Sequence, residues 1–303
     1  RSLVGSEMCI RDSFMISLYP SFYDKFLCKA GDCLHSCCIQ NWDIDIDDGT
    51  AEKYKQTDGP LGDELRNAMI SGSDGFRFIM TEEGCCPFFD DNGLCRIVLE
   101  KGDDYLCDIC AMHPRFFVYV SDFELSGVGL SCEKSVELLL SEEGPLSFTT
   151  EKGNDFFDLP AILEALDFSP TAEEIIFTPR IDKKYYENLL SFLKKTEAID
   201  EAWTSRLASL VKDLPFAEEK VTAFPKNPSA LSRVYQYILY RGLEKSEHYG
   251  IPAVMEYARQ STDFILLETA LYGDFPENIR RWSEQIEYDT ENTDLWLRRV
   301  SSL

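Results

Sequence analysis

The chain has 303 residues, of which 44% are hydrophobic and 13% aromatic. That apolar content offsets the entropy of ordering a chain, so intrinsic disorder is excluded, and the length suggests about two domains. With 30 basic and 54 acidic residues the net charge is −24, which disfavours nucleic-acid binding and attracts a lysine-bearing partner. Since no stretch approaches the ~18 apolar residues of a membrane span, no membrane association is predicted.

Residues 1–14 (RSLVGSEMCIRDSF) lack apolar periodicity and the apolar core of a signal peptide. We expect them to be a non-native leader, with Met15 as the native start, and we leave Cys9 out of the site. Without a secretory signal the predicted location is the cytoplasm, where thiols stay reduced.

The first half of the chain contains signals for both helices and strands. Acidic residues 43–48 (DIDIDD) begin a short strand or a loop. Helices are predicted at 50–56 and 61–71, the second ended by Gly72, and a strand at 76–80. After a turn at 91–93, a hairpin is predicted over 115–130 around Ser121 and Asp122, then a helix at 131–140 capped by Ser131.

From Leu159 onward the apolar residues recur at helical spacing, which predicts helices at 181–195, 202–210, 230–243 and 252–272. Three prolines mark 213–228 as the best linker candidate. The expected fold class is α+β and mainly α: a small cysteine-rich metal-binding region with a short antiparallel sheet (15–150), followed by an all-helical region (151–303).

Ten of the eleven cysteines lie between Cys28 and Cys132. Clustered cysteines in a reducing compartment indicate metal binding rather than disulfides. Thiolates in this number suit zinc or an iron–sulfur cluster. Because there are only three histidines (His35, His113 and His248), histidine-rich zinc catalysis is disfavoured. The close pairs Cys85–Cys86 and Cys107–Cys110 are either zinc-type ligands or passengers beside the true ligands.

Six motifs in order resemble the bacterial flagellin lysine-N-methylases, within a broader class of cysteine-rich zinc- or iron-chelating proteins. They are Phe26-x-Cys28; Gly31-x-Cys33-x3-Cys37-Cys38-x3-Trp42; Cys86-Pro87-Phe88; Gly93-Leu94-Cys95-x-Ile97; Cys110-x3-Pro114-Arg115; and Leu130-Ser131-Cys132. The resemblance is close from Met15 to about Leu140 and continues loosely to Gln285–Asn292. His113 stands where the family usually has tyrosine.

The resemblance implies that the metal ligands are among Cys28, Cys33, Cys37, Cys38, Cys86, Cys95, Cys110 and Cys132. Cys85 and Cys107 fall outside this set. It also implies methyl transfer from S-adenosylmethionine to flagellin lysines, with an iron–sulfur cluster, 4Fe–4S in type, as the metal centre and zinc as the alternative.

Neither common methyltransferase scaffold is visible in the sequence. Gly127-Val128-Gly129 lacks the third glycine of a dinucleotide-binding turn, and the spacing Cys-x3-Cys-x2-Cys fails because Gln40 stands at its third position.

If the protein methylates, the target lysine must be neutral to attack the methyl carbon. Asp43, Asp45 and Asp47 are the candidate bases. Trp42 and Arg115 are candidates for contact with donor or substrate, Arg115 also as a catalytic residue. The alternative function is non-catalytic: an iron or zinc store, a sensor, or a structural zinc module.

Overall fold

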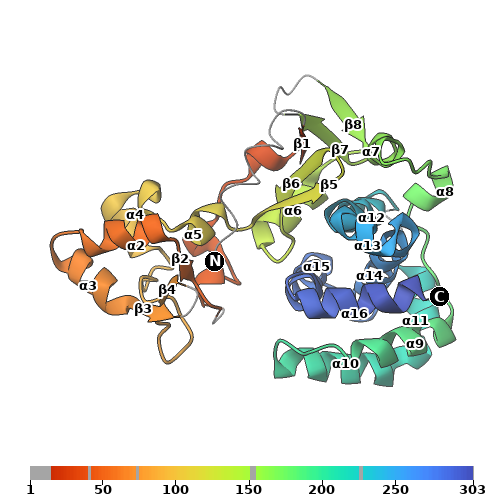
Figure 1. Ribbon diagram of the computed structural model, residues 1–303. Coiled ribbons are helices and arrows are strands. Elements are labelled where there is room, and N and C mark those ends of the chain that lie inside the picture. The colour runs from red at the N-terminus through yellow and green to blue at the C-terminus, as the bar shows by residue number, and fades with distance from the viewer. Residues whose placement is uncertain (1–14, 40–41, 73–74, 151–154, 225–227, 303) are drawn as a thin grey trace. The chain divides into compact units, whose positions relative to one another are not determined.

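A computed structural model describes residues 15–39, 42–72, 75–150, 155–224 and 228–302 (Figure 1). The leader, Cys9 and Gln40 therefore lie outside the described residues. The chain divides into two compact units: residues 27–115, here called the cysteine-rich unit, and the large unit, formed by the described residues before Leu27 and after Arg115. The division differs from the boundary expected at residue 150, because residues 116–150 supply strands and a helix to the large unit.

The cysteine-rich unit is built from short elements. Its helices are α2 (Asp48–Lys55), α3 (Pro60–Ala68), α4 (Arg96–Lys101) and α5 (Asp108–Met112). Three 3₁₀ turns accompany them: η2 (Ala30–Asp32), η3 (Cys37–Ile39) and η4 (Asp103–Tyr105). Strands β2 (Asp45–Ile46), β4 (Gly75–Phe78) and β3 (Met69–Gly72) form an antiparallel sheet in that order.

The structure corrects the helix predicted at 61–71. Helix α3 ends at Ala68, and Met69–Gly72 is strand β3, which pairs with β4 in the register Met69 to Phe78. The backbone groups of these residues therefore bond across a hairpin instead of along a helix. Helix α2 begins earlier than predicted, at Asp48, because the Asp47 side chain accepts a hydrogen bond from Thr50 N at 2.8 Å and so caps it.

The large unit contains a five-stranded sheet in the order β5 (Arg115–Val120), β6 (Phe123–Val128), β1 (Ile16–Pro20), β7 (Ser147–Thr150) and β8 (Phe156–Asp158). The hairpin strands predicted at 115–130 are confirmed as β5 and β6. The sheet is mixed rather than antiparallel, because β1 runs parallel to β6. The buried Tyr240 hydroxyl lies 2.7 Å from Leu18 O and 3.0 Å from Ser126 O, so it links these two strands.

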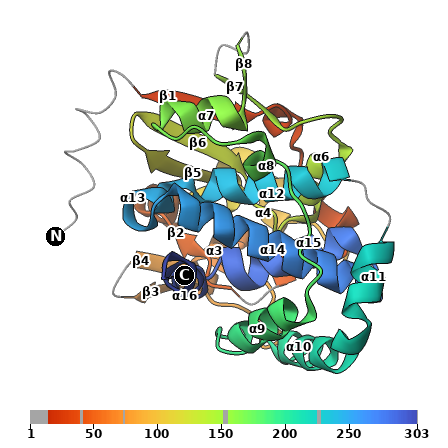
Figure 2. The same ribbon diagram turned by 90° about the vertical axis from the view of Figure 1, so that its right-hand side faces the viewer.

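Helices make up the rest of the large unit (Figure 2). They are α6 (Glu133–Ser141), α7 (Leu159–Ala165), α8 (Ala172–Ile175), α9 (Lys183–Leu193), α10 (Glu201–Asp213), α11 (Ala217–Ala223), α12 (Pro228–Gly242), α13 (Ser246–Tyr249), α14 (Ile251–Tyr272), α15 (Phe275–Trp282) and α16 (Thr290–Ser301). The turns η1 (Tyr23–Lys25), η5 (Leu214–Phe216), η6 (Leu243–Lys245) and η7 (Ser283–Glu287) complete the unit.

The four helices predicted from apolar spacing correspond to α9, α10, α12 and α14. The linker prediction at 213–228 is partly wrong, because α11 lies within it and buries Ala217 and Val221. Ser131 does not cap α6: the cap position is Cys132, which makes no side-chain capping bond. The mainly helical α+β class is confirmed.

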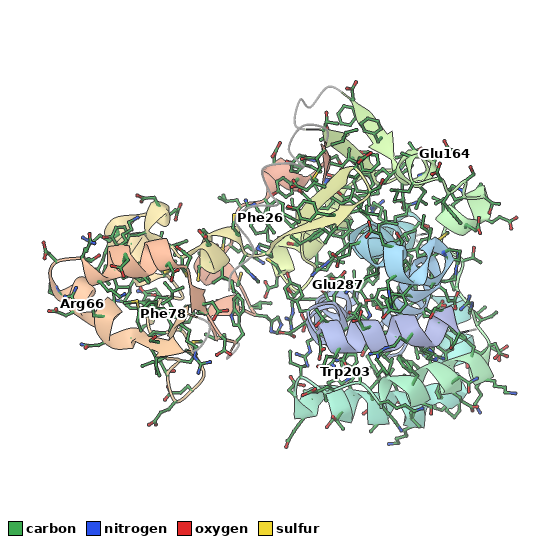
Figure 3. The ribbon with its side chains drawn as sticks, in the orientation of Figure 1. Phe26, Arg66, Phe78, Glu164, Trp203 and Glu287 are labelled. Atoms are coloured by element: carbon green, nitrogen blue, oxygen red, sulfur yellow. The ribbon has the colours of Figure 1, made fainter. Side chains whose placement is uncertain are left out.

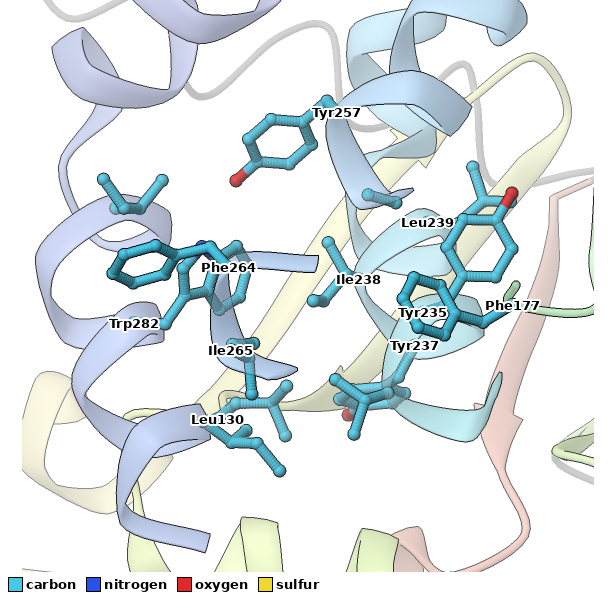
Figure 4. Packing of buried hydrophobic residues seen from close by; sticks show 14 of the residues in the cluster. Leu130, Phe177, Tyr235, Tyr237, Ile238, Leu239, Tyr257, Phe264, Ile265 and Trp282 are labelled. Atoms are coloured by element: carbon cyan, nitrogen blue, oxygen red, sulfur yellow. The ribbon is translucent and has the colours of Figure 1, made fainter. Parts of the chain in front are cut away.

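Helix α14 is the central element of the large unit, and it packs against α12, α15 and α16. Its residues Phe264 and Ile265 lie beside Trp282 of α15 and Ile238 of α12 in an apolar core (Figure 4). No helix in the described part of the chain is long and apolar enough to span a membrane.

Candidate functional site

Five cysteines from separate segments gather in the core of the cysteine-rich unit. Cys86 and Cys107 are 8% and 1% exposed, and the others pack against the same apolar cluster as Tyr54 and Phe78. Figure 3 labels Phe78 in this unit. We call these five the thiol group: Cys38, Cys86, Cys95, Cys107 and Cys110.

Backbone hydrogen bonds hold the segments of the thiol group together. Cys86 N donates to Cys38 O at 2.8 Å, so the first cysteine loop and the Cys-Pro-Phe segment are in direct contact. A β-bridge joins Phe89 to Cys95 across the turn between them. Cys107 is the cap position of α5 and Cys110 lies within that helix. Four stretches of sequence thus converge on one small core.

Two glycines allow a close crossing beside the thiol group. Gly93 has a φ of +77°, in the left-handed region that glycine adopts most easily. A Cβ built on Gly93 lies 2.9 Å from Gly31 Cα, and one on Gly31 lies 2.7 Å from Asn92 O. The Cys28–Cys33 loop therefore packs on the turn that leads to Cys95 only because both positions lack side chains.

The surroundings of these thiols give them different pKa values. A hydrogen bond with the Cys37 thiol lowers the pKa of Cys38 to about 7. Burial raises the pKa of Cys86 to about 12 and also raises that of Cys95. The hydrogen bond between Cys107 and Cys110 lowers the pKa of Cys107 and raises that of Cys110. Neighbouring thiolates oppose one another's ionisation, as like charges do in a low-dielectric core.

The donor set fits a soft metal. None of the ten described cysteines forms a disulfide, and a buried group of sulfur donors matches the ligand preference of zinc or iron–sulfur clusters. Within the described residues, no three His, Cys, Asp or Glu side chains have the spacing of a formed metal site. The thiols are thus gathered in one core but not arranged around one point.

The other cysteines implied as ligands are not members of this group, although the Cys37 thiol hydrogen-bonds to Cys38. Cys28 is exposed, and Cys33 and Cys37 are half-buried in the loop before Trp42. Cys132 belongs to the large unit. Cys85 is half-buried next to Cys86. Cys107, which the family resemblance leaves out, is the most buried member of the thiol group.

The acidic candidates for a base do not share one environment. Asp47 caps α2, and its Oδ2 accepts from Asp108 N at 3.0 Å, so its oxygens are already engaged. Asp43 is exposed and forms an ion pair with Arg77 at 3.3 Å. Asp45 is exposed on β2. Alternation along the sequence therefore did not place these three carboxylates in one site.

The remaining candidates have structural contacts. Trp42 donates its indole N–H to Cys37 O at 2.7 Å, and its ring lies 5.2 Å from that of His113. Burial lowers the pKa of His113 to about 4, so this imidazole is neutral at pH 7. Arg115 begins β5, and His35 is exposed.

The glycines of Gly127-Val128-Gly129 serve packing in the large unit. The Tyr237 hydroxyl accepts from Val128 N and donates to Val128 O, both at 2.8 Å. A Cβ on Gly127 would lie 2.6 Å from that hydroxyl, and one on Gly129 would lie 2.1 Å from the Tyr288 hydroxyl. The segment thus makes room for two tyrosines and forms no dinucleotide-binding turn.

Fold and site together define a mainly helical protein with a separate unit that buries a group of thiols. The chain is 23% identical over 139 residues to the flagellar biosynthetic protein FliU of Salmonella muenchen, covering 44% of this chain and 82% of that protein. It is 23% identical over 136 residues to the lysine-N-methylases of Salmonella typhimurium and Salmonella choleraesuis, covering 43% of this chain and 34% of each.

This chain thus spans about a third of the length of the two lysine-N-methylases that it matches. No protein-family model matches the sequence, and no solved structure does. The likeness connects the chain distantly to a named lysine methylase and to a flagellar protein.

Proposed function

We propose that this protein is a lysine N-methylase that transfers a methyl group from S-adenosylmethionine to lysines of flagellin. Two observations support the proposal: the distant likeness to proteins named lysine-N-methylase, and the buried thiol group in the unit where the family-like motifs occur. The convergence of these thiols is the observation that carries the proposal. They are up to 72 residues apart along the chain, and the fold brings them into one core.

Four cysteines belong both to the thiol group and to the set implied by the resemblance: Cys38, Cys86, Cys95 and Cys110. We assign these as the ligands of an iron–sulfur cluster, which needs four thiolates. Cys107 then acts as a hydrogen-bond partner of Cys110. A cluster held by these four cysteines would supply an iron that can bind the methionine part of the donor.

The protein's own contribution to methyl transfer is to present a neutral amine. The neutral lysine nitrogen forms a bond to the methyl carbon as the carbon–sulfur bond breaks, and the electron pair of that carbon–sulfur bond passes to sulfur. The methylated ammonium then releases a proton to solvent. Asp47 is excluded as acceptor of that proton, because its carboxylate caps α2 and binds Asp108 N.

The test begins with anaerobic purification and quantification of iron, zinc and sulfide per chain. We expect iron and sulfide in equal amounts and a broad absorbance near about 400 nm. Cys86→Ser should abolish both, whereas the adjacent Cys85→Ser should keep them. Cys107→Ser should keep the metal but shift its absorbance or reduction potential, because it changes a hydrogen bond to a ligand sulfur.

Enzymatic function is then separated from metal storage or sensing. The loaded protein should bind S-adenosylmethionine in a calorimeter. It should also raise the mass of purified flagellin in steps of about 14 Da, one for each methyl group added to a lysine. Metal-loaded protein that neither binds the donor nor modifies flagellin would support the non-catalytic alternative. Zinc without sulfide would support a structural zinc module.

A further inference from the structure

The large unit contains a group of polar side chains within its apolar interior, at the π-helical turn η7 (Ser283–Glu287). In this turn Tyr288 N donates to Ser283 O, five residues earlier, at 3.0 Å. Such widened turns are rare and occur often at functional sites. The turn leaves the Glu287 side chain only 6% exposed, whereas the next residue, Tyr288, is 43% exposed.

The Glu287 carboxylate is satisfied on one oxygen only. Its Oε2 accepts from Arg241 Nη1 at 2.8 Å and from Ser283 Oγ at 2.6 Å. Its Oε1 is buried and has no hydrogen-bond partner among the residues that the structure describes. A buried carboxylate oxygen without a donor is uncommon in folded proteins. Glu287 lies among the helices of the large unit (Figure 3).

Aromatic rings surround the ion pair. The Arg241 guanidinium lies 4.9 Å from the Phe116 ring centre and 4.7 Å from that of Tyr288, so it stacks between them. Because Gly129 has no Cβ, the Tyr288 hydroxyl can lie against its backbone. The partly exposed Tyr288 ring therefore lies against the same Arg241 guanidinium that binds the Glu287 carboxylate, and aromatic faces attract cations.

The buried Tyr257 hydroxyl lies close to the Thr293 and Ser261 side chains, which lower its pKa. Burial nevertheless raises the pKa of Tyr257, and the Glu287 charge adds to that rise, so the two groups interact. Figure 4 shows Tyr257 beside the core residues of α12 and α15.

We propose that Glu287 binds the alkylammonium group of a protein lysine. A single carboxylate oxygen that lacks a hydrogen-bond partner suits a compact ammonium, because a guanidinium requires two parallel acceptors. A metal ion requires more oxygen ligands than this site offers. The aliphatic lysine stem packs on the aromatic walls while its charge reaches the carboxylate. The choice of lysine as natural ligand rests on the proposed function; the ammonium site itself rests on the contacts above.

The test is calorimetry of the full chain with Nα-acetyl-lysine methylamide, with the norleucine analogue as a control that lacks the ammonium. We expect the lysine compound to bind at least tenfold more tightly than norleucine. Glu287→Gln should remove at least tenfold of that affinity, and Glu291→Gln, which removes an exposed charge nearby, should change it less than twofold. Equal binding of the two compounds by the wild-type protein would overturn the proposal.

A second variant protects the test from misfolding. If Glu287→Gln does not fold, Tyr288→Leu removes the cation-attracting ring and should weaken lysine binding at least threefold; unchanged binding overturns the proposal. Binding of pentylamine without binding of the blocked lysine overturns the assignment to a protein lysine. The two proposals can fail separately. If amine binding depends on Glu287 but the protein transfers no methyl group, the ammonium site is supported and the methylase function is refuted. If the protein transfers methyl groups with a KM that Glu287→Gln does not change, the methylase function is supported and the ammonium site is refuted.

Discussion

Replacing Gly93 by alanine tests whether the crossing of two glycines assembles the thiol group. The left-handed φ of +77° costs a residue with a Cβ about 1–2 kcal/mol. The new Cβ would also lie 2.9 Å from Gly31 Cα, a backbone atom that cannot rotate away, and such overpacking costs about 1–3 kcal/mol. The expected loss of stability in the cysteine-rich unit is the sum of these costs, about 2–5 kcal/mol.

Hydrogen exchange read by mass spectrometry measures this loss in each unit separately. The amide of Cys86, which bonds to Cys38 O, should exchange about 30 to 4,000 times faster in Gly93→Ala, since each 1.4 kcal/mol corresponds to about tenfold. Gly59→Ala is the matched control: its φ is +85°, but nothing lies within 4 Å of the added Cβ, so only strain is introduced. If both variants accelerate exchange equally, the crossing does not hold the thiol group together.

Two further predictions concern buried groups. Tyr237→Phe should lower the free energy of unfolding by about 1–3 kcal/mol in urea titration, because Val128 N and O lose their buried partner; wild-type stability would show that these backbone groups find other partners. His113 has a pKa of about 4 in the folded protein, against its ordinary value of 6.5. Between these two values the unfolded chain binds more protons than the folded one. The free energy of unfolding should therefore fall as the pH drops from 6.5 to 4, by up to about 3 kcal/mol. His113→Phe should flatten this dependence, and a slope unchanged in that variant would assign it to other groups.

The sequence by itself determined most of the helices. Apolar residues at three- and four-residue steps predicted α9, α10, α12 and α14, because a helix buries one face whatever it packs against. The strand-like segments on either side of Ser121 and Asp122 likewise predicted the strands β5 and β6. The density of cysteines between Cys28 and Cys132 also indicated a thiol-based site without any knowledge of the fold.

Only the tertiary structure decided which residues come together. The end of α3 depends on pairing between Met69 and Phe78, and the position of Cys107 in the thiol group depends on how α5 packs; neither is encoded in local spacing. Glu287 lies in the segment Gln285–Asn292, to which the resemblance extends, but its burial could not be predicted, because it results from a π-helical turn and from Arg241, 46 residues earlier. Periodicity reports how a segment divides between core and solvent, whereas a site arises from contacts between segments that are distant along the chain.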